Sequence, residues 1–284
     1  MGSFTDDEGV VIETFEWGVE APRGVVQISH GIGEHSGRYA ALAADLNRAG
    51  LAVVADDHRG HGVTGMRQWG DPARLGRLGP GGLRATIAGI DRFGALTRER
   101  YAGVPLVLLA HSWGSLMAQI ALNRHPDRYD GVVLSGTAYR RPGWMDAGDL
   151  NRRHRSLGTT GAEWLSRDPA VARAWVEDPY TFPAQTAKLL GVRDSLRLLG
   201  RPARHLPASL PLLIQVGSDD TLGAGRSAER LARAYRERSG LTDVTVHVYE
   251  GARHEVYNET NRDEVVADLV AWIETHVLTK EAAR

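Results

Sequence analysis

The chain has 284 residues, of which 42% are hydrophobic and 24% are charged, so it is long enough for one sizeable α/β core plus an insertion. A formal net charge of -1 excludes the strongly basic surface that nucleic-acid binding requires, and the lack of cysteine excludes disulfides, thiolate catalysis and cysteine-ligated metal sites. No apolar run reaches the length that spans a bilayer, and the acidic Asp6, Asp7 and Glu8 are unlike a secretory leader. We therefore expect a cytoplasmic protein.

Two hydrophobic patterns alternate along most of the chain. Short continuous runs of Val, Leu and Ile predict buried strands, and apolar residues at helical spacing predict amphipathic helices. The predicted strands are Val25 to Ser29, Leu51 to Ala55, Leu106 to Ala110, Val132 to Ser135, Leu212 to Val216 and Val244 to Tyr249. The predicted helices are Arg38 to Ala49, Leu83 to Arg98, Trp113 to Arg124, Arg226 to Arg238 and Asn261 to His276. This alternation is typical of a mainly parallel α/β sheet covered by helices on both faces.

One segment breaks the alternation. Residues 140–206 contain no convincing strand but hold five prolines and three tryptophans. We expect a core made of residues 1–139 and 207–284, with 140–206 as a helical cap, or lid, inserted after the sixth strand and lying over the carboxyl edge of the sheet. The alternative is a loosely attached surface excursion, against which the tryptophans argue because they need something to pack on.

The cap sequence carries two further signals. It has 12 Lys or Arg against 7 Asp or Glu, which would attract anionic amphiphiles or a membrane surface, although solvated arginines on helix faces are an equal alternative. Leu189, Val192, Leu196 and Leu199 fall on one helix face and would line an acyl entrance or pack on the core. We favour packing on the core.

A candidate nucleophile lies in AHSWGS, residues 110–115, directly after a predicted strand. A sharp strand-turn-helix corner requires small residues two positions before and two positions after its apex. Around Ser112 these positions are Ala110 and Gly114. A serine at the apex of that corner is exposed to a substrate carbonyl. The alternative is that Ser112 only caps the following helix.

A serine nucleophile needs a histidine base and a carboxylate. His254 follows the last predicted strand, and Asp219 and Asp220 follow the strand before it, so all reach the same sheet edge as Ser112. The order Ser, Asp, His is that of a triad built on such a sheet. The acid usually stands three residues beyond the glycine that ends its strand, which favours Asp220, with Asp219 as a turn residue.

Acyl transfer also needs hydrogen-bond donors for the oxyanion. The glycine-rich turn 30–33 follows the first predicted strand, and the N–H groups of Ile32 and Trp113 are the expected pair. His30 at that turn is predicted to be structural, and residues 57–62, DHRGHG, are expected to tie loops together beneath the site. No histidine and carboxylate cluster has metal-ligand spacing, and no glycine loop has a nucleotide-binding form.

Five segments together resemble the monoacylglycerol lipase and lysophospholipase branch of the α/β-hydrolases. They are HGIGEHSGRY (30–39), DHRGHG (57–62), AHSWGS (110–115), GSDD (217–220) and YEGARH (249–254). The likeness covers nearly the whole chain apart from the cap, and HGxGEHSGRY is its most specific motif. It implies the α/β-hydrolase fold, with Ser112, Asp220 and His254 as triad and Ile32 and Trp113 as oxyanion hole.

The elbow of that family usually reads GHSMGG, so Ala110, Trp113 and Ser115 are departures, and the Trp113 side chain is expected to alter which acyl chains fit. The leading hypothesis is a cofactor-free serine hydrolase of lipid esters with medium or long acyl chains, of monoacylglycerol or lysophospholipid type, with transient membrane or micelle contact through the cap. The alternatives are a small-molecule carboxylesterase, thioesterase or acyltransferase with the same triad, and a non-catalytic ligand-binding scaffold.

Overall fold

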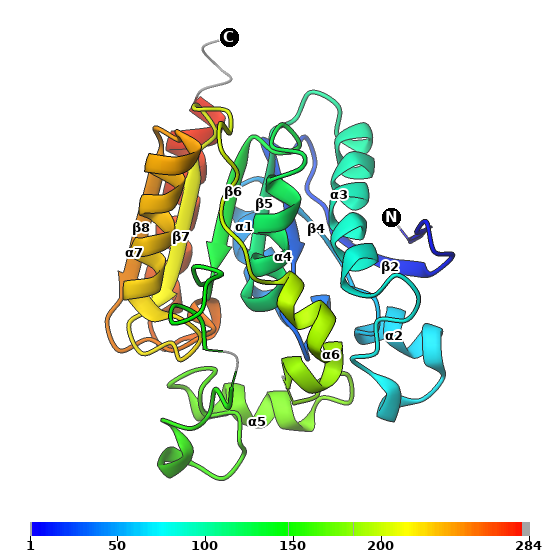
Figure 1. The fold of residues 1–284 in the computed structure, drawn as a ribbon. Coiled ribbons are helices and arrows are strands. Elements are labelled where there is room, and N and C mark those ends of the chain that lie inside the picture. The colour runs from blue at the N-terminus through cyan, green and yellow to red at the C-terminus, as the bar shows by residue number, and fades with distance from the viewer. Residues whose placement is uncertain (1, 147, 184, 280–284) are drawn as a thin grey trace.

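The computed structural model of the chain describes residues 2–146, 148–183 and 185–279. In this part of the chain an eight-stranded sheet has the order β1-β2-β4-β3-β5-β6-β7-β8 (Figure 1). The first two strands are antiparallel to their neighbours, and the other six run parallel. The strands are β1 (Ser3–Thr5), β2 (Val11–Trp17), β3 (Gly24–Ser29), β4 (Leu51–Asp56), β5 (Leu106–His111), β6 (Gly131–Ser135), β7 (Leu212–Gly217) and β8 (Val244–Tyr249).

The parallel strands form as the sequence predicts because they are buried on both faces. Every residue of β3, β4, β5, β6 and β7 is buried, which is why these segments read as continuous apolar runs. Each predicted strand matches an observed strand to within one residue at either end. The prediction of a mainly parallel sheet is confirmed.

Helices cover the sheet on both faces (Figure 1). One face packs against α1 (Ala40–Arg48) and α8 (Arg262–Ile273), and the other against α3 (Gly82–Arg100), α4 (Ser112–Leu122) and α7 (Ala224–Ala234). The predicted helices ending at Arg238 and His276 each finish in a π-helical turn, Tyr235–Ser239 and Glu274–Leu278. Among the described residues, no helix combines the length and the hydropathy needed to cross a bilayer.

The chain between β6 and β7 lies beyond the carboxyl ends of the strands (Figure 1). It contains α5 (Pro169–Glu177), α6 (Thr186–Arg197) and irregular turns. It is fastened to the core on two sides, because the Phe182 N–H donates to Gly33 O at 3.0 Å and the Glu255 N–H donates to Leu165 O at 2.8 Å. These bonds argue against the alternative of a loosely attached excursion.

The predicted packing of the hydrophobic face at 189–199 on the core is wrong for two of its four residues, since only Leu189 and Leu199 are half-buried. Val192 is 76% exposed and Leu196 is 59% exposed. Gly191 has non-helical backbone angles (φ 71°, ψ 171°), so the helix is interrupted and the face that the sequence pattern implied is not continuous. Two apolar side chains of this segment face solvent instead of the core.

Candidate active site

The sharp turn between β5 and α4 presents Ser112 at the carboxyl edge of the sheet. Ser112 has a positive φ of 52°, which is costly for a residue with a Cβ. A Cβ on Gly114 would lie 2.4 Å from the carbonyl oxygens of Ser29 and His30, so glycine is required there. The predicted strained elbow is confirmed in its backbone geometry.

The loops after β7 and β8 bring Asp220 and His254 to the serine. His254 Nε2 lies 2.7 Å from Ser112 Oγ, and His254 Nδ1 lies 2.9 Å from Asp220 Oδ1. With Nδ1 donating its proton to the carboxylate, Nε2 is left to accept the serine proton. All three residues are buried, His254 and Asp220 at 1% exposure each. Among the described residues, no hydrogen bond or ion pair joins Asp219 to His254; the Asp219 N–H donates to Ala252 O in the turn.

The environment of His254 favours its charged form. Burial lowers the pKa of the imidazole, but the Asp220 charge and hydrogen bond, together with the negative charges of Glu255 and Glu34, outweigh burial and raise the pKa above its ordinary value. Trp164, from the segment between β6 and β7, lies against the ring with centroids 4.7 Å apart. Its carbonyl also accepts from the His254 N–H at 3.3 Å. The imidazole is therefore held from the core and from that segment together.

The turn after β3 faces the serine from the opposite side. The turn approaches Ser112 closely at Gly31, because a Cβ added to Gly31 would lie 3.0 Å from Ser112 Cβ. Within residues 2–146, 148–183 and 185–279, the Ile32 and Trp113 N–H groups have no hydrogen-bond partner. Both amides are available to an oxyanion formed next to Ser112 Oγ.

A buried ion-pair network holds this turn, and the sequence interpretation did not assign it a role. Glu34 Oε1 accepts from the Gly31 N–H at 2.5 Å, and Arg38 Nη1 donates to Glu34 at 2.8 Å and to Glu255 at 2.6 Å. Burial raises the pKa of Glu255, but Arg38 outweighs it and brings the pKa to about 2. Because Glu255 follows His254, Arg38 ties the turn after β3 to the loop that carries His254. The i, i+4 spacing of Glu34 and Arg38 was the signal in the sequence.

The other motif histidines pack beneath the site. His30 Nδ1 lies 2.7 Å from Gly31 O and its Nε2 accepts from the His58 N–H, so His30 is structural, as predicted. The DHRGHG loop is tied to its neighbours through Asp57, which accepts from Ser36 N–H at 2.9 Å, and through buried Arg59. Burial lowers the pKa of His61 to about 3, so its ring is neutral.

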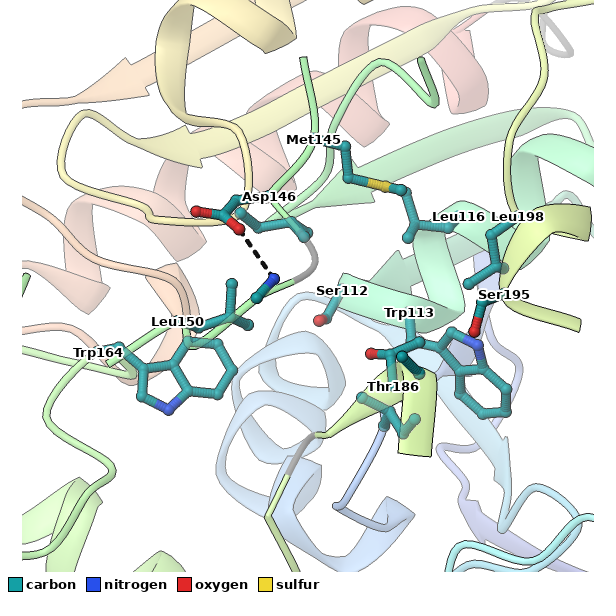
Figure 2. A pocket seen from close by; sticks show the side chains of 14 residues that line it. Ser112, Trp113, Leu116, Met145, Asp146, Leu150, Trp164, Thr186, Ser195 and Leu198 are labelled. Carbon is teal, nitrogen blue, oxygen red and sulfur yellow. Dashed lines mark hydrogen bonds between the residues drawn. The ribbon is translucent and has the colours of Figure 1, made fainter. Parts of the chain in front are cut away.

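An apolar cavity of about 70 Å³ opens beside Ser112 (Figure 2). A larger pocket of about 560 Å³ lies next to it in the segment between β6 and β7, since Leu150, Trp164 and Thr186 line both. Among the described residues, no group of three or more histidine and carboxylate side chains is arranged to hold a metal ion. The inner cavity is lined by Ile32, Ser112, Trp113, Leu116, Met145, Asp146, Gly148, Leu150, Trp164, Thr186, Ala187, Ser195, Leu198 and Leu222.

Fold and site together define an α/β-hydrolase. The chain belongs to the family described as serine aminopeptidase, S33, whose sequence model matches residues 20–261. It is 30% identical to a monoacylglycerol lipase of Mycolicibacterium smegmatis, over 97% of both chains. It is 28% identical to human monoglyceride lipase, over 92% of this chain and 86% of that protein.

Solved structures show the same fold. A thermostable carboxyl esterase from Bacillus coagulans superposes with a TM-score of 0.82 at 24% identity, over 97% of both chains. The monoacylglycerol lipase of Paleococcus ferrophilus superposes with a TM-score of 0.69 at 26% identity, over 93% of this chain and 99% of that one. The family resemblance stated from the sequence motifs is confirmed.

Proposed function

We propose that the protein is a serine hydrolase that cleaves carboxylic esters with medium or long acyl chains, of the monoacylglycerol lipase or lysophospholipase type. The observation that carries this proposal is the continuous contact from Ser112 Oγ through His254 to Asp220 beside an apolar cavity. Membership of the family and similarity to monoacylglycerol lipases over the whole chain support the substrate class.

In this mechanism Ser112 Oγ attacks the ester carbonyl while His254 Nε2 takes its proton, and Asp220 stabilises the imidazolium. The Ile32 and Trp113 N–H groups stabilise the oxyanion of the tetrahedral intermediate. His254 then protonates the leaving alcohol, and an acyl group remains on Ser112. Water, deprotonated by His254, attacks the acyl carbonyl and releases the acid, with no cofactor.

The acyl chain is proposed to run from Ser112 through the inner cavity into the larger pocket of residues 140–206. We propose this segment as a cap, distinct from the core of residues 1–139 and 207–284. A cavity of about 70 Å³ is roughly half the size of one that holds benzene, so a longer chain must continue outward under the cap. The lining residues that the two pockets share support a medium or long chain over acetyl or butyryl groups.

The experiment is a turnover panel of glyceryl and lysophospholipid esters from acetyl to oleoyl, run on the wild type and Ser112→Ala. We expect the highest kcat/KM from decanoyl upward, and a loss of about three orders of magnitude or more in Ser112→Ala with an unchanged circular dichroism spectrum. A maximum at acetyl or butyryl esters would favour the small-molecule esterase alternative. Near-normal turnover by Ser112→Ala would contradict the mechanism.

We also propose that the cap contacts membranes or micelles transiently and that the protein works in the cytoplasm. Val192 and Leu196 of the cap are exposed, as are Leu157 (58%) and Val176 (52%), and the cap sequence has an excess of basic residues. Exposed apolar side chains beside cationic ones favour an anionic lipid surface. Cosedimentation with anionic vesicles should fall in Val192→Ser/Leu196→Ser. Val248→Ser, with a 40% exposed valine outside the cap, is the control and should bind like the wild type.

A further inference from the structure

Two polar atoms stand out in the apolar wall of the inner cavity. The indole Nε1 of Trp113 and the hydroxyl of Ser195 are both buried, and neither has a hydrogen-bond partner among the described residues. Both residues line the same cavity, and their side chains overlap in the view of Figure 2. One atom comes from the core and the other from α6 in the proposed cap, so together they form a polar spot where the two parts meet.

The indole ring of Trp113 is held in place by its neighbours. Trp113 is 2% exposed, and its ring stacks on His61 with centroids 5.3 Å apart and an interplanar angle of 26°. An indole nitrogen only donates, and a buried donor without an acceptor is destabilising. Most buried polar groups in proteins have partners, so these two atoms beside a nucleophile are open to an oxygen atom of water or of a ligand.

We propose that Trp113 Nε1 and Ser195 Oγ bind an oxygen atom carried by the acyl chain of the substrate. This inference rests on the proposed function and narrows the substrate class to esters of hydroxy or oxo fatty acids. A carbonyl or hydroxyl oxygen accepts from the indole N–H, and Ser195 donates to it or accepts from it. Because Trp113 directly follows Ser112 in the chain, the oxygen belongs to the part of the acyl chain nearest the ester.

The surroundings assign the oxygen to the acyl chain rather than to the alcohol. The same cavity is lined by Leu116, Met145 and Leu198, whose apolar side chains contact methylene groups well. A plain alkyl chain would fill the space and leave both polar atoms unpaired. A site built to pair a substrate oxygen discriminates strongly against the analogue that lacks it.

The test compares glyceryl decanoate with its 3-, 5-, 7- and 9-hydroxy derivatives. In the wild type we expect one position, at carbon 3 or 5, to raise kcat/KM about tenfold or more over decanoate. Trp113→Phe, which retains the backbone N–H, and Ser195→Ala should each reduce this ratio about tenfold, whatever happens to the rate on decanoate itself. Thr186→Val removes another hydroxyl of the same lining, from a half-buried residue, and should leave the ratio unchanged.

Several outcomes would overturn the inference. If decanoate is hydrolysed and no hydroxylated ester is preferred at any position, the two atoms hold only water. The same conclusion follows if the ratio is equal in wild type, Trp113→Phe and Ser195→Ala. If the variants change instead the ratio of glyceryl to methyl decanoate, the oxygen belongs to the alcohol. Should Trp113→Phe fail to fold, Ser195→Ala decides alone. Failure of the proposed function is distinct, because then no ester of the panel is hydrolysed.

Discussion

Replacement of Arg38 by methionine tests whether the buried ion-pair network holds the site together. The Arg38 side chain is only 11% exposed, and its partners Glu34 and Glu255 are each 5% exposed. Removing one partner of a buried ion pair leaves an uncompensated charge and costs about 3–5 kcal/mol. At about 2 cal/mol/K per residue for the entropy of unfolding, a chain of 284 residues would lose about 5–8 °C in Tm.

Arg48→Met is the matched control. Arg48 pairs with Asp45 at the end of α1, but its side chain is 71% exposed, and exposed ion pairs contribute about 0–1 kcal/mol. Calorimetry and urea titration on both variants should therefore separate them by several degrees. Adding Glu34→Gln and Glu255→Gln to Arg38→Met should recover part of the loss, because the unpaired charges are then gone. Equal stability of Arg38→Met and Arg48→Met would refute the reasoning.

Two further predictions use single substitutions. Glu255→Gln removes a negative charge that raises the pKa of His254. The pKa of His254 should therefore fall, and the acid limb of the kcat/KM profile should move to lower pH. A shift to higher pH would contradict the assignment of His254 as the base. In α3, the Cβ of Gly89→Ala would meet nothing within 4 Å, so this substitution should raise the free energy of unfolding by about 0.5–1 kcal/mol. Gly94→Ala in the same helix would place its Cβ 2.6 Å from the Tyr129 hydroxyl and should lower the free energy of unfolding. Urea titration compares the two, and equal effects would show that packing around α3 is wrongly described.

The parallel core could be predicted because burial on both faces leaves an uninterrupted apolar run in the sequence. The sequence analysis did not predict β1 and β2, because neither strand is an uninterrupted apolar run. β1 has only three residues, and β2 alternates partly buried and buried positions over VIETFEW, which is a weak pattern at a sheet edge. α2 (Gly62–Trp69) was missed because its two glycines mimic a turn. The predicted packing failed for Val192 and Leu196, because Gly191 breaks the helical period that the four apolar residues suggested.

Within the site, the positions of Ser112, Asp220 and His254 could be predicted because carboxyl ends of parallel strands converge at one sheet edge. Contacts that irregular segments make with the site could not be predicted, because such segments have no periodic spacing in the sequence. Trp164 reaches His254 from a segment without a regular period, and no pattern pointed to it. The Glu34 and Arg38 pair was visible within its motif, but its third member, Glu255, lies 217 residues beyond Arg38 and becomes evident only in the folded chain.

The most direct test of the central claim is covalent labelling of the nucleophile. A fluorophosphonate reacts with a serine hydroxyl only when a neighbouring base removes its proton and donors stabilise the oxyanion. Intact-mass spectrometry should show one adduct on the wild type, mapped by peptide fragmentation to Ser112, and none on Ser112→Ala. His254→Ala should slow labelling by about a hundredfold or more. An adduct on another residue, or undiminished labelling of Ser112→Ala, would contradict the assignment of Ser112 as nucleophile.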